Sequence, residues 1–213
     1  MKLFTKSYLT LIFLCCVLFL TNTYANAETK LDYKNFNLLE NVTVKGNVLV
    51  RTPFSVYYEW LPEDAKIPEN SVIQVIPDAQ NPLASDSAVV IGSHTITLFP
   101  AASLRLTKEG ITPLTGRINL NTQEENFPPV VINTRKCHGE YYYGNLFIEM
   151  DPEDNIFIAM QDNGKAWFKD NSLTVYELND SFELLFPLYG ATTSKRRVSS
   201  FWKESPKTFG NLK

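Results

Sequence analysis

The sequence predicts an all-β protein built from many short strands, with little helix. Three observations support this fold class: short apolar–polar alternations, turn formers that separate them every 8–12 residues or so, and no convincing helical periodicity outside a weak signal near the C-terminus. Such a chain can form a sandwich, a barrel-like sheet or a short β-solenoid, and all three remain open.

Residues 88–106 give the clearest strand pattern, and we expect the other strands to pack around them. Gly92 and Ser93 break an apolar run at 89–91, after which residues 95–99 alternate small polar with apolar side chains. Pro100 ends this strand because it lacks a backbone N–H and fixes φ. A turn at 101–103 then leads into a further short strand.

The N-terminus predicts export. Lys2 and Lys6 precede an uncharged apolar run at residues 8–20, and Ala25 and Ala27 form an Ala-x-Ala cleavage site. These are the parts of a secretory signal peptide. The apolar run falls short of the roughly 20 residues that span a bilayer, although an uncleaved membrane anchor remains the alternative.

The cysteines agree with an exported chain stabilised by its core. Cys15 and Cys16 lie within the signal peptide, and Leu14 stands where a lipidation site needs a small residue, so we exclude a lipoprotein. The mature chain keeps only Cys137, which we interpret as a small apolar filler, with an intermolecular disulfide as the alternative. We expect a periplasmic or secreted protein with no stable membrane span after processing.

Charge divides the mature chain into an acidic body and a basic tail. The whole chain has a net charge of −3, which becomes −5 without Lys2 and Lys6. From residue 191 onward the chain has six basic residues and one acidic residue, Glu204, so this tail carries a net charge of +5. The acidic body excludes nucleic acid as a partner, because nucleic-acid binding needs a basic face.

The first half continues as strands and turns. Alternating valines around Gly46 at residues 42–50 predict a strand pair or a bulged strand, and residues 72–76 a further strand. Residues 78–86 read as a loop, and Gly116 breaks the strand expected at 111–120.

The second half also alternates short strands with turns. Residues 141–150 form a strand around Gly144, and residues 156–161 another. Asn163-Gly164 predicts a tight hairpin with 165–169 as the partner strand, because Gly supplies the positive φ of such turns. Further strands are expected at 172–178 and 181–189.

Residues 42–120 resemble FecR-like domains. The motifs that carry the resemblance are GNVLV at 46–50, Trp60, IPENS at 67–71, ITLFPAASLRL at 96–106 and LTGRI at 114–118. Such domains are periplasmic β-rich modules, often the sensing half of a transmembrane anti-sigma regulator coupled to an outer-membrane transporter. Residues 1–6 are too short for the cytoplasmic domain of such a regulator, so the resemblance implies a free-standing exported domain. It supplies no catalytic residues.

The expected organisation has four parts. Residues 1–27 are the signal peptide, 28–120 a FecR-like β domain, 121–190 a β-rich continuation packed on the first, and 191–213 a basic aromatic tail.

The sequence offers no convincing catalytic or metal site, so we expect no enzyme activity and no cofactor. Cys137 and His138 are neighbours that would point to opposite faces of a strand, and His94 lies beside a turn, where we expect a solvated or capping side chain. Gly92-Ser93-His94-Thr95 lacks the second glycine of a nucleophile elbow, which argues against a Ser93–His138 triad.

We predict a non-catalytic binding or interaction module of the bacterial cell envelope, whose partner is an envelope protein or a glycan polymer. A structural component that self-assembles is the first alternative, and an enzyme of unrecognised type the second. Aromatic and basic side chains are the candidate surface, with core packing as the competing interpretation of the aromatic residues. The residues of this surface are Tyr141, Tyr142, Tyr143, Arg196, Arg197 and Trp202. Trp60 and Trp167 are further aromatic residues that could form a stacking platform.

Overall fold

The computed structural model describes residues 37–198, except 62–64, 77–86, 123, 124, 126, 152–154, 180 and 188–192. This part of the chain forms fifteen strands and no helix, so the predicted all-β class is confirmed. No helix in it could therefore cross a membrane. The strands are β1 (Val42–Lys45), β2 (Val48–Arg51), β3 (Glu59–Trp60), β4 (Val72–Val75), β5 (Ser87–Ile91), β6 (His94–Leu98), β7 (Ser103–Leu106), β8 (Gly110–Thr122), β9 (Val130–Asn133), β10 (Cys137–Met150), β11 (Ile156–Met160), β12 (Lys165–Asp170), β13 (Val175–Leu178), β14 (Phe182–Phe186) and β15 (Ser194–Arg197).

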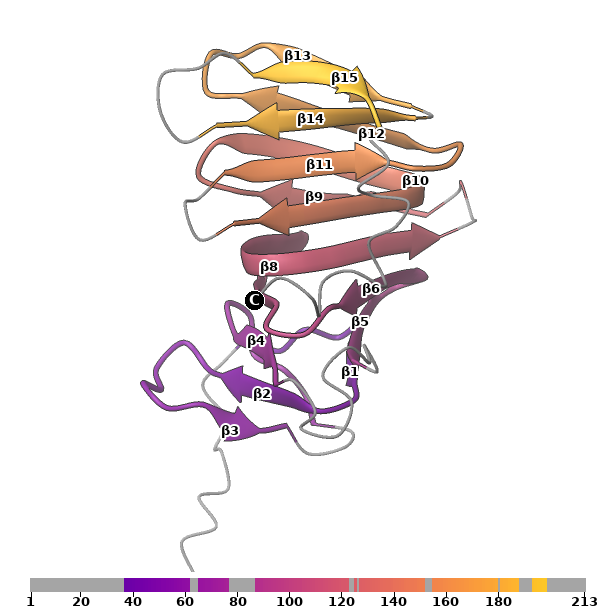
Figure 1. The fold of residues 1–213 in the computed structure, drawn as a ribbon. Coiled ribbons are helices and arrows are strands. Elements are labelled where there is room, and N and C mark those ends of the chain that lie inside the picture. Colours follow the sequence, from indigo (N-terminus) through magenta and orange to yellow (C-terminus); the bar gives the residue numbers. More distant parts are fainter. Residues whose placement is uncertain are drawn as a thin grey trace, which may run out of the picture. The chain divides into compact units, whose positions relative to one another are not determined.

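All fifteen strands belong to one continuous sheet that folds into two layers (Figure 1). The first layer has the order β1-β5-β6-β8-β10-β11-β14-β15. The second has the order β3-β2-β4-β7-β8-β9-β10-β12-β13. Neighbouring strands are antiparallel except β8 and β9, which are parallel. Of the architectures expected from the sequence, this arrangement is a sandwich, open at both ends.

Strands β8 and β10 run through both layers, and a glycine marks the corner in each. Before Gly116, β8 pairs with β7 in the second layer, and from Gly116 onward it pairs with β10 in the first. Strand β10 likewise changes layers at Gly144. The φ angles of +72° and +105° explain why glycine occupies these corners, since other residues are strained there. Gly116 thus bends a long strand where the sequence suggested a break, and Gly144 bends the strand expected around it.

Two expected strand pairs are wrong for the same reason. The turn at Asn163-Gly164 does not join partners, because β11 and β12 both pair with β10, one in each layer. The turn at Gly46 likewise carries the chain from β1 in the first layer to β2 in the second. Gly46 has the positive φ of a turn glycine, +90°, whereas Gly164 does not adopt the positive φ expected of it. Both turns lie where the sequence predicts them, but the chain uses each of them to change layers.

The hydrophobic core lies between the two layers. One cluster of buried apolar side chains takes members from both layers and from both halves of the chain. Ring contacts cross the core: His94 of β6 meets Tyr141 of β10 edge-on with centroids 5.6 Å apart, and Tyr176 of β13 meets Phe186 of β14 at 6.0 Å. Side chains that alternate with this core point outward, and these outward faces provide the candidate sites.

Candidate functional site

The largest exposed apolar side chains cluster at the end of the second layer. They belong to the aromatic loop, which we define as residues 52–60 between β2 and the end of β3. Ser55 shapes the loop: its Oγ donates to the Tyr57 carbonyl oxygen at 3.0 Å and accepts from the Tyr57 N–H at 3.1 Å. The exposed fractions are 83% for Phe54, 78% for Val56, 75% for Tyr57, 38% for Tyr58 and 62% for Trp60.

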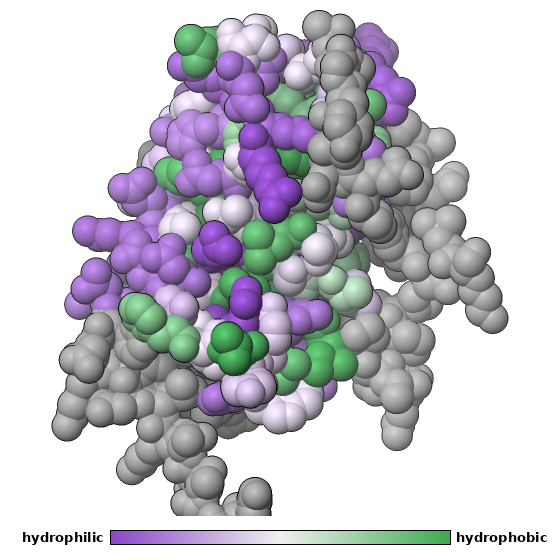
Figure 2. Space-filling model, turned by 90° about the vertical axis from the view of Figure 1, so that its left-hand side faces the viewer, coloured by the Kyte–Doolittle hydropathy of each residue, from purple (hydrophilic) through white to green (hydrophobic). Residues whose placement is uncertain are grey.

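Strand β3 ends the second layer beside this loop (Figure 1). It pairs with β2 through Trp60 opposite Leu49 and Glu59 opposite Val50. Among the described strands β3 has no second partner, so its outer backbone edge can accept another strand. Figure 2 faces the side toward which the β2–β3 loop protrudes in Figure 1. Hydrophobic side chains gather in the lower half of that face, and hydrophilic ones prevail above.

Two arginines flank the aromatic loop. Arg51 and Arg105 both line a hollow of about 350 Å³, together with Ser55 and Asn70, and none of its lining residues is acidic. Both arginines share a register row with Val72, which places them on the same face of the sheet. The Arg51 guanidinium lies over the Tyr58 ring, 5.3 Å from its centroid, a cation–π contact that orients it. The hollow is therefore electropositive.

A second polar and aromatic site occupies the outward face of β10 and β12. The Glu140 carboxylate accepts hydrogen bonds from the Tyr142 hydroxyl at 2.5 Å and from Trp167 Nε1 at 3.1 Å. The hydrogen bond to Glu140 raises the pKa of Tyr142, because the proton is held between them. His138 packs against Trp167 with ring centroids 5.6 Å apart, and Lys165 Nζ lies 4.9 Å from the Tyr142 ring centroid. We call these residues the Glu140 cluster.

Two members of the Glu140 cluster, Trp167 and Lys165, line an open groove of about 850 Å³. Trp167 and Tyr143 supply aromatic surface to this groove. The polar and charged lining residues are Asn163, Lys165, Lys169, Glu177 and Asn179. The groove thus combines rigid ring faces with amide and charged groups.

The structure separates the residues that the sequence grouped as one surface. Tyr141 is fully buried in the core and donates to the Gly144 carbonyl oxygen at 2.8 Å, so it cannot contact a partner. Tyr142 and Tyr143 are half-buried on the second layer. Arg196 and Arg197 are exposed on β15 in the first layer, where Arg196 pairs with Glu183, and Trp202 lies outside the described residues. Core packing is therefore correct for one tyrosine of the three.

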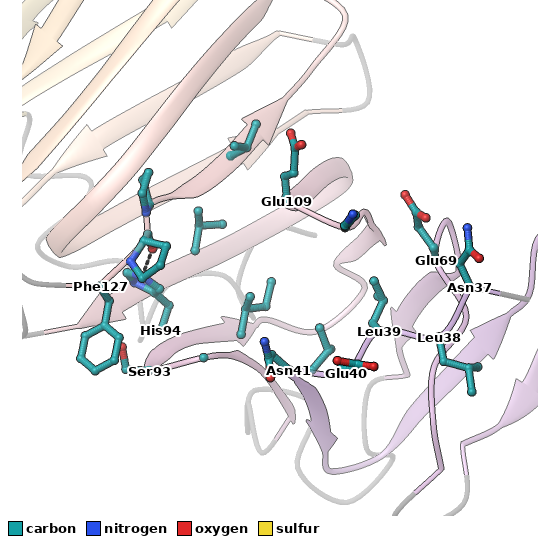
Figure 3. Close-up of a pocket in the computed structure, with 18 residues that line it drawn as sticks. Asn37, Leu38, Leu39, Glu40, Asn41, Glu69, Ser93, His94, Glu109 and Phe127 are labelled. Atoms are coloured by element: carbon teal, nitrogen blue, oxygen red, sulfur yellow. Dashed lines mark hydrogen bonds between the residues drawn. The ribbon is translucent and has the colours of Figure 1, made fainter.

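A cavity of about 1010 Å³ lies where the segment before β1 meets the β5–β6 turn and the segment before β9. Figure 3 shows His94 and Phe127 on one side of it and Asn37, Leu38 and Glu69 on the other. His94 Nε2 donates to the Pro128 carbonyl oxygen at 2.8 Å. Burial lowers the pKa of His94, so the ring is neutral and ties the segment before β9 to β6. The expectation of a solvated or capping His94 is wrong.

The described residues bring no catalytic constellation together. No group of three or more His, Cys, Asp or Glu side chains in this part of the chain could hold a metal ion. Ser93 follows β5 in the first layer, whereas His138 faces outward from the second, so they form no nucleophile–base pair. Cys137 is buried and His138 exposed, as strand alternation predicted.

Sequence reasoning considered Trp60 as an exposed aromatic side chain but missed the rest of the aromatic loop, Arg105 and Glu140. The loop did have a signal in the sequence, because apolar residues are frequent there but do not alternate with polar ones. Five of the seven residues from 54 to 60 are valine or aromatic. Arg51 and Arg105 lie far apart in the sequence, and only the register of three strands brings them to one face.

No protein-family model and no curated protein matches the sequence. Among solved structures, two crystal structures of a candidate anti-sigma factor from Parabacteroides distasonis ATCC 8503, at 2.50 and 1.65 Å resolution, are similar with a TM-score of 0.45. They are 14% and 13% identical in sequence, and each match covers 53% of this chain. The chain spans little more than half the length of those proteins, 56% and 57%.

Proposed function

We propose that this protein is an exported, non-catalytic interaction module of the FecR-like kind, and that it binds a partner protein of the cell envelope through the aromatic loop and the edge of β3. The observation that carries the proposal is the cluster of five large exposed apolar side chains beside a strand edge. Soluble monomers rarely expose such clusters unless they bind something.

The geometry favours an extended segment as the bound element. The edge of β3 that no described strand covers offers backbone N–H and C=O groups, with which a strand of the partner can pair. Tyr57 and Trp60 then act as aromatic anchors beside it, the residue types that contribute most to binding energy at interfaces.

The charge of the hollow specifies the chemistry of that segment. Arg51 and Arg105 meet no carboxylate among the residues that line it. A partner segment with an acidic residue next to its apolar anchors would supply the missing charge, and guanidinium–carboxylate pairs are often bidentate. We therefore expect an acidic, extended partner segment.

Export and the FecR-like resemblance support the same proposal. The signal peptide predicts a mature chain that begins at Glu28, outside the cytoplasm. Three motifs of the resemblance lie in strands of the same continuous sheet: Trp60 ends β3, residues 96–106 run from β6 into β7, and Gly116 marks the corner of β8. This region includes the proposed binding end.

Photo-crosslinking in cells tests the proposal. Benzoylphenylalanine replaces Tyr57 in the aromatic loop or, as a control, Ser172, which is also exposed but lies in the β12–β13 turn. We expect one envelope protein to be captured from position 57 only, through an extended acidic segment mapped by mass spectrometry. The N-terminal peptide, measured in the same experiment, should begin at Glu28.

Variants decide whether the capture is specific. With the purified partner, Trp60→Ala should weaken binding by about tenfold or more without loss of stability, because its side chain is exposed. Arg51→Gln with Arg105→Gln should reduce both the affinity and its dependence on salt. Equal capture from both positions contradicts the proposal, and capture of the chain by itself supports the self-assembling alternative.

A further inference from the structure

The groove beside Trp167 has the composition of a ligand site that is independent of the aromatic loop. Strands β12 and β13 lie at one end of the second layer and β3 at the other (Figure 1). The groove volume of about 850 Å³ lies in the range of small-molecule sites. We propose that this groove binds an acidic oligosaccharide.

Trp167 is held in place before any ligand arrives. Its Nε1 donates to Glu140, which also accepts from Tyr142, and the His138 ring packs against the indole. A ring fixed in this way loses little conformational freedom on binding. A sugar presents apolar C–H groups on its face, and these pack on such an indole ring.

The polar lining matches sugar hydroxyls. Asn163 and Asn179 offer both donors and acceptors, and Glu177 offers acceptors only. The Tyr143 ring adds a second aromatic surface. A protein partner would be expected to bury a larger apolar centre than this groove provides, which favours a glycan over a peptide.

The charges specify an acidic sugar. Lys165 and Lys169 line the groove against one carboxylate, that of Glu177. Neither lysine forms an ion pair within the described part of the chain. Lys165 is positioned over the Tyr142 ring, 4.9 Å from its centroid. The two lysines lie four residues apart on β12, with their Cα atoms about 13 Å from each other. Carboxylates on separate units of an acidic oligosaccharide would each meet one ammonium group.

NMR titration of the mature protein with two hexasaccharides tests this assignment. The acidic probe is the hyaluronan hexasaccharide, which alternates glucuronic acid with N-acetylglucosamine, and the neutral probe is chitohexaose. We expect the Trp167 indole N–H resonance to shift saturably with the acidic probe, with an affinity about tenfold or more above that for chitohexaose. Equal affinity for the two probes, or no shift at millimolar concentration, would overturn the proposal.

Variants separate the groove from a general effect on folding. Lys165→Gln with Lys169→Gln should weaken binding of the acidic probe by about tenfold, and both positions are surface sites where folding tolerates the change. Trp60→Ala, which removes an exposed indole from the opposite end of the second layer, should leave sugar binding unchanged. Loss of sugar binding in the Trp60 variant would place the sugar at the aromatic loop and overturn the proposal. Because this titration contains no protein partner, its result does not depend on whether the aromatic loop binds one.

Discussion

The buried guanidinium of Arg117 lies directly opposite the carboxylate of Glu149 on the adjacent strand, with Nη2 and Oε2 2.5 Å apart. Arg117 alternates with Ile118, which belongs to the main core, so Arg117 points out of the first layer, yet only 1% of its side chain is exposed. A second apolar cluster lies on the same outward face, where Phe147 and Ala159 are buried beside Val198. The outward face of the first layer is therefore covered around Arg117, whose charge is compensated by Glu149.

Removing one member of the Arg117–Glu149 pair should strongly destabilise the folded protein. In Glu149→Gln the guanidinium keeps its charge but loses its carboxylate, so the free energy of unfolding should fall by about 3–5 kcal/mol. Replacement of both residues by methionine should recover most of this loss, because neither charge then has to be desolvated. Urea denaturation measures both effects. Lys45→Met, at an exposed position, is the control, and a Glu149→Gln loss no larger than that of Lys45→Met would contradict the argument.

Substitution of a glycine at a corner between the layers should lower the free energy of unfolding more than substitution of an ordinary turn glycine. A Cβ on Gly144 would lie 2.6 Å from the Gly164 Cα, at a φ of +105°. Gly144→Ala should therefore cost roughly 3 kcal/mol or more, because backbone has to move in addition to the conformational strain. Gly92→Ala is the matched control: its φ is +60° but no atom lies within 4 Å of the new Cβ, so about 1 kcal/mol is expected. Thermal unfolding distinguishes the two.

These corners also show how far the sequence predicts the fold. Alternation and turn residues correctly predict the all-β class and the strands around Pro100, because both signals are local. They do not reveal that Gly116 and Gly144 bend strands between layers, since a glycine that breaks a strand and one that bends it look alike. The pairing of β11 and β12 with β10 depends on contacts between distant residues, which no local pattern encodes.

In the candidate sites, too, the sequence predicts local features correctly and misses those that depend on strand pairing. Alternation correctly separates Cys137 from His138, but it gives no preference for which of Tyr141 and Tyr142 faces the core. Glu140 becomes a site residue only because the register of β10 and β12 places it opposite Trp167. A carboxylate between two aromatic donors has no sequence signature when one donor lies on another strand.

The Cys137 thiol should be unreactive in the folded protein. Its side chain is buried, and burial raises its pKa to about 11, with the Thr134 hydroxyl as a hydrogen-bonding neighbour that acts in the opposite direction. At about pH 8 the thiolate that reacts with Ellman's reagent is therefore scarce and shielded, and the rate should be at least about a hundredfold below that of a free cysteine. Denaturation in guanidinium chloride should restore full reactivity. Fast labelling of the native chain, or a disulfide-linked dimer, would contradict the filler interpretation.

The buried His94 should make the protein less stable in mild acid. Burial lowers its pKa in the folded state below the ordinary value of 6.5, partly offset by the hydrogen bond to Pro128. As the pH falls below 6.5, the unfolded chain binds a proton that the folded chain resists, so the free energy of unfolding falls by at most about 1.4 kcal/mol per pH unit until the folded pKa is reached. His94→Gln can still donate to the Pro128 carbonyl oxygen but cannot titrate, so it should flatten this part of the profile. Denaturation between about pH 7.5 and about pH 4.5 compares this variant with the unsubstituted protein. An acid-side slope that persists in His94→Gln would assign the effect to other groups.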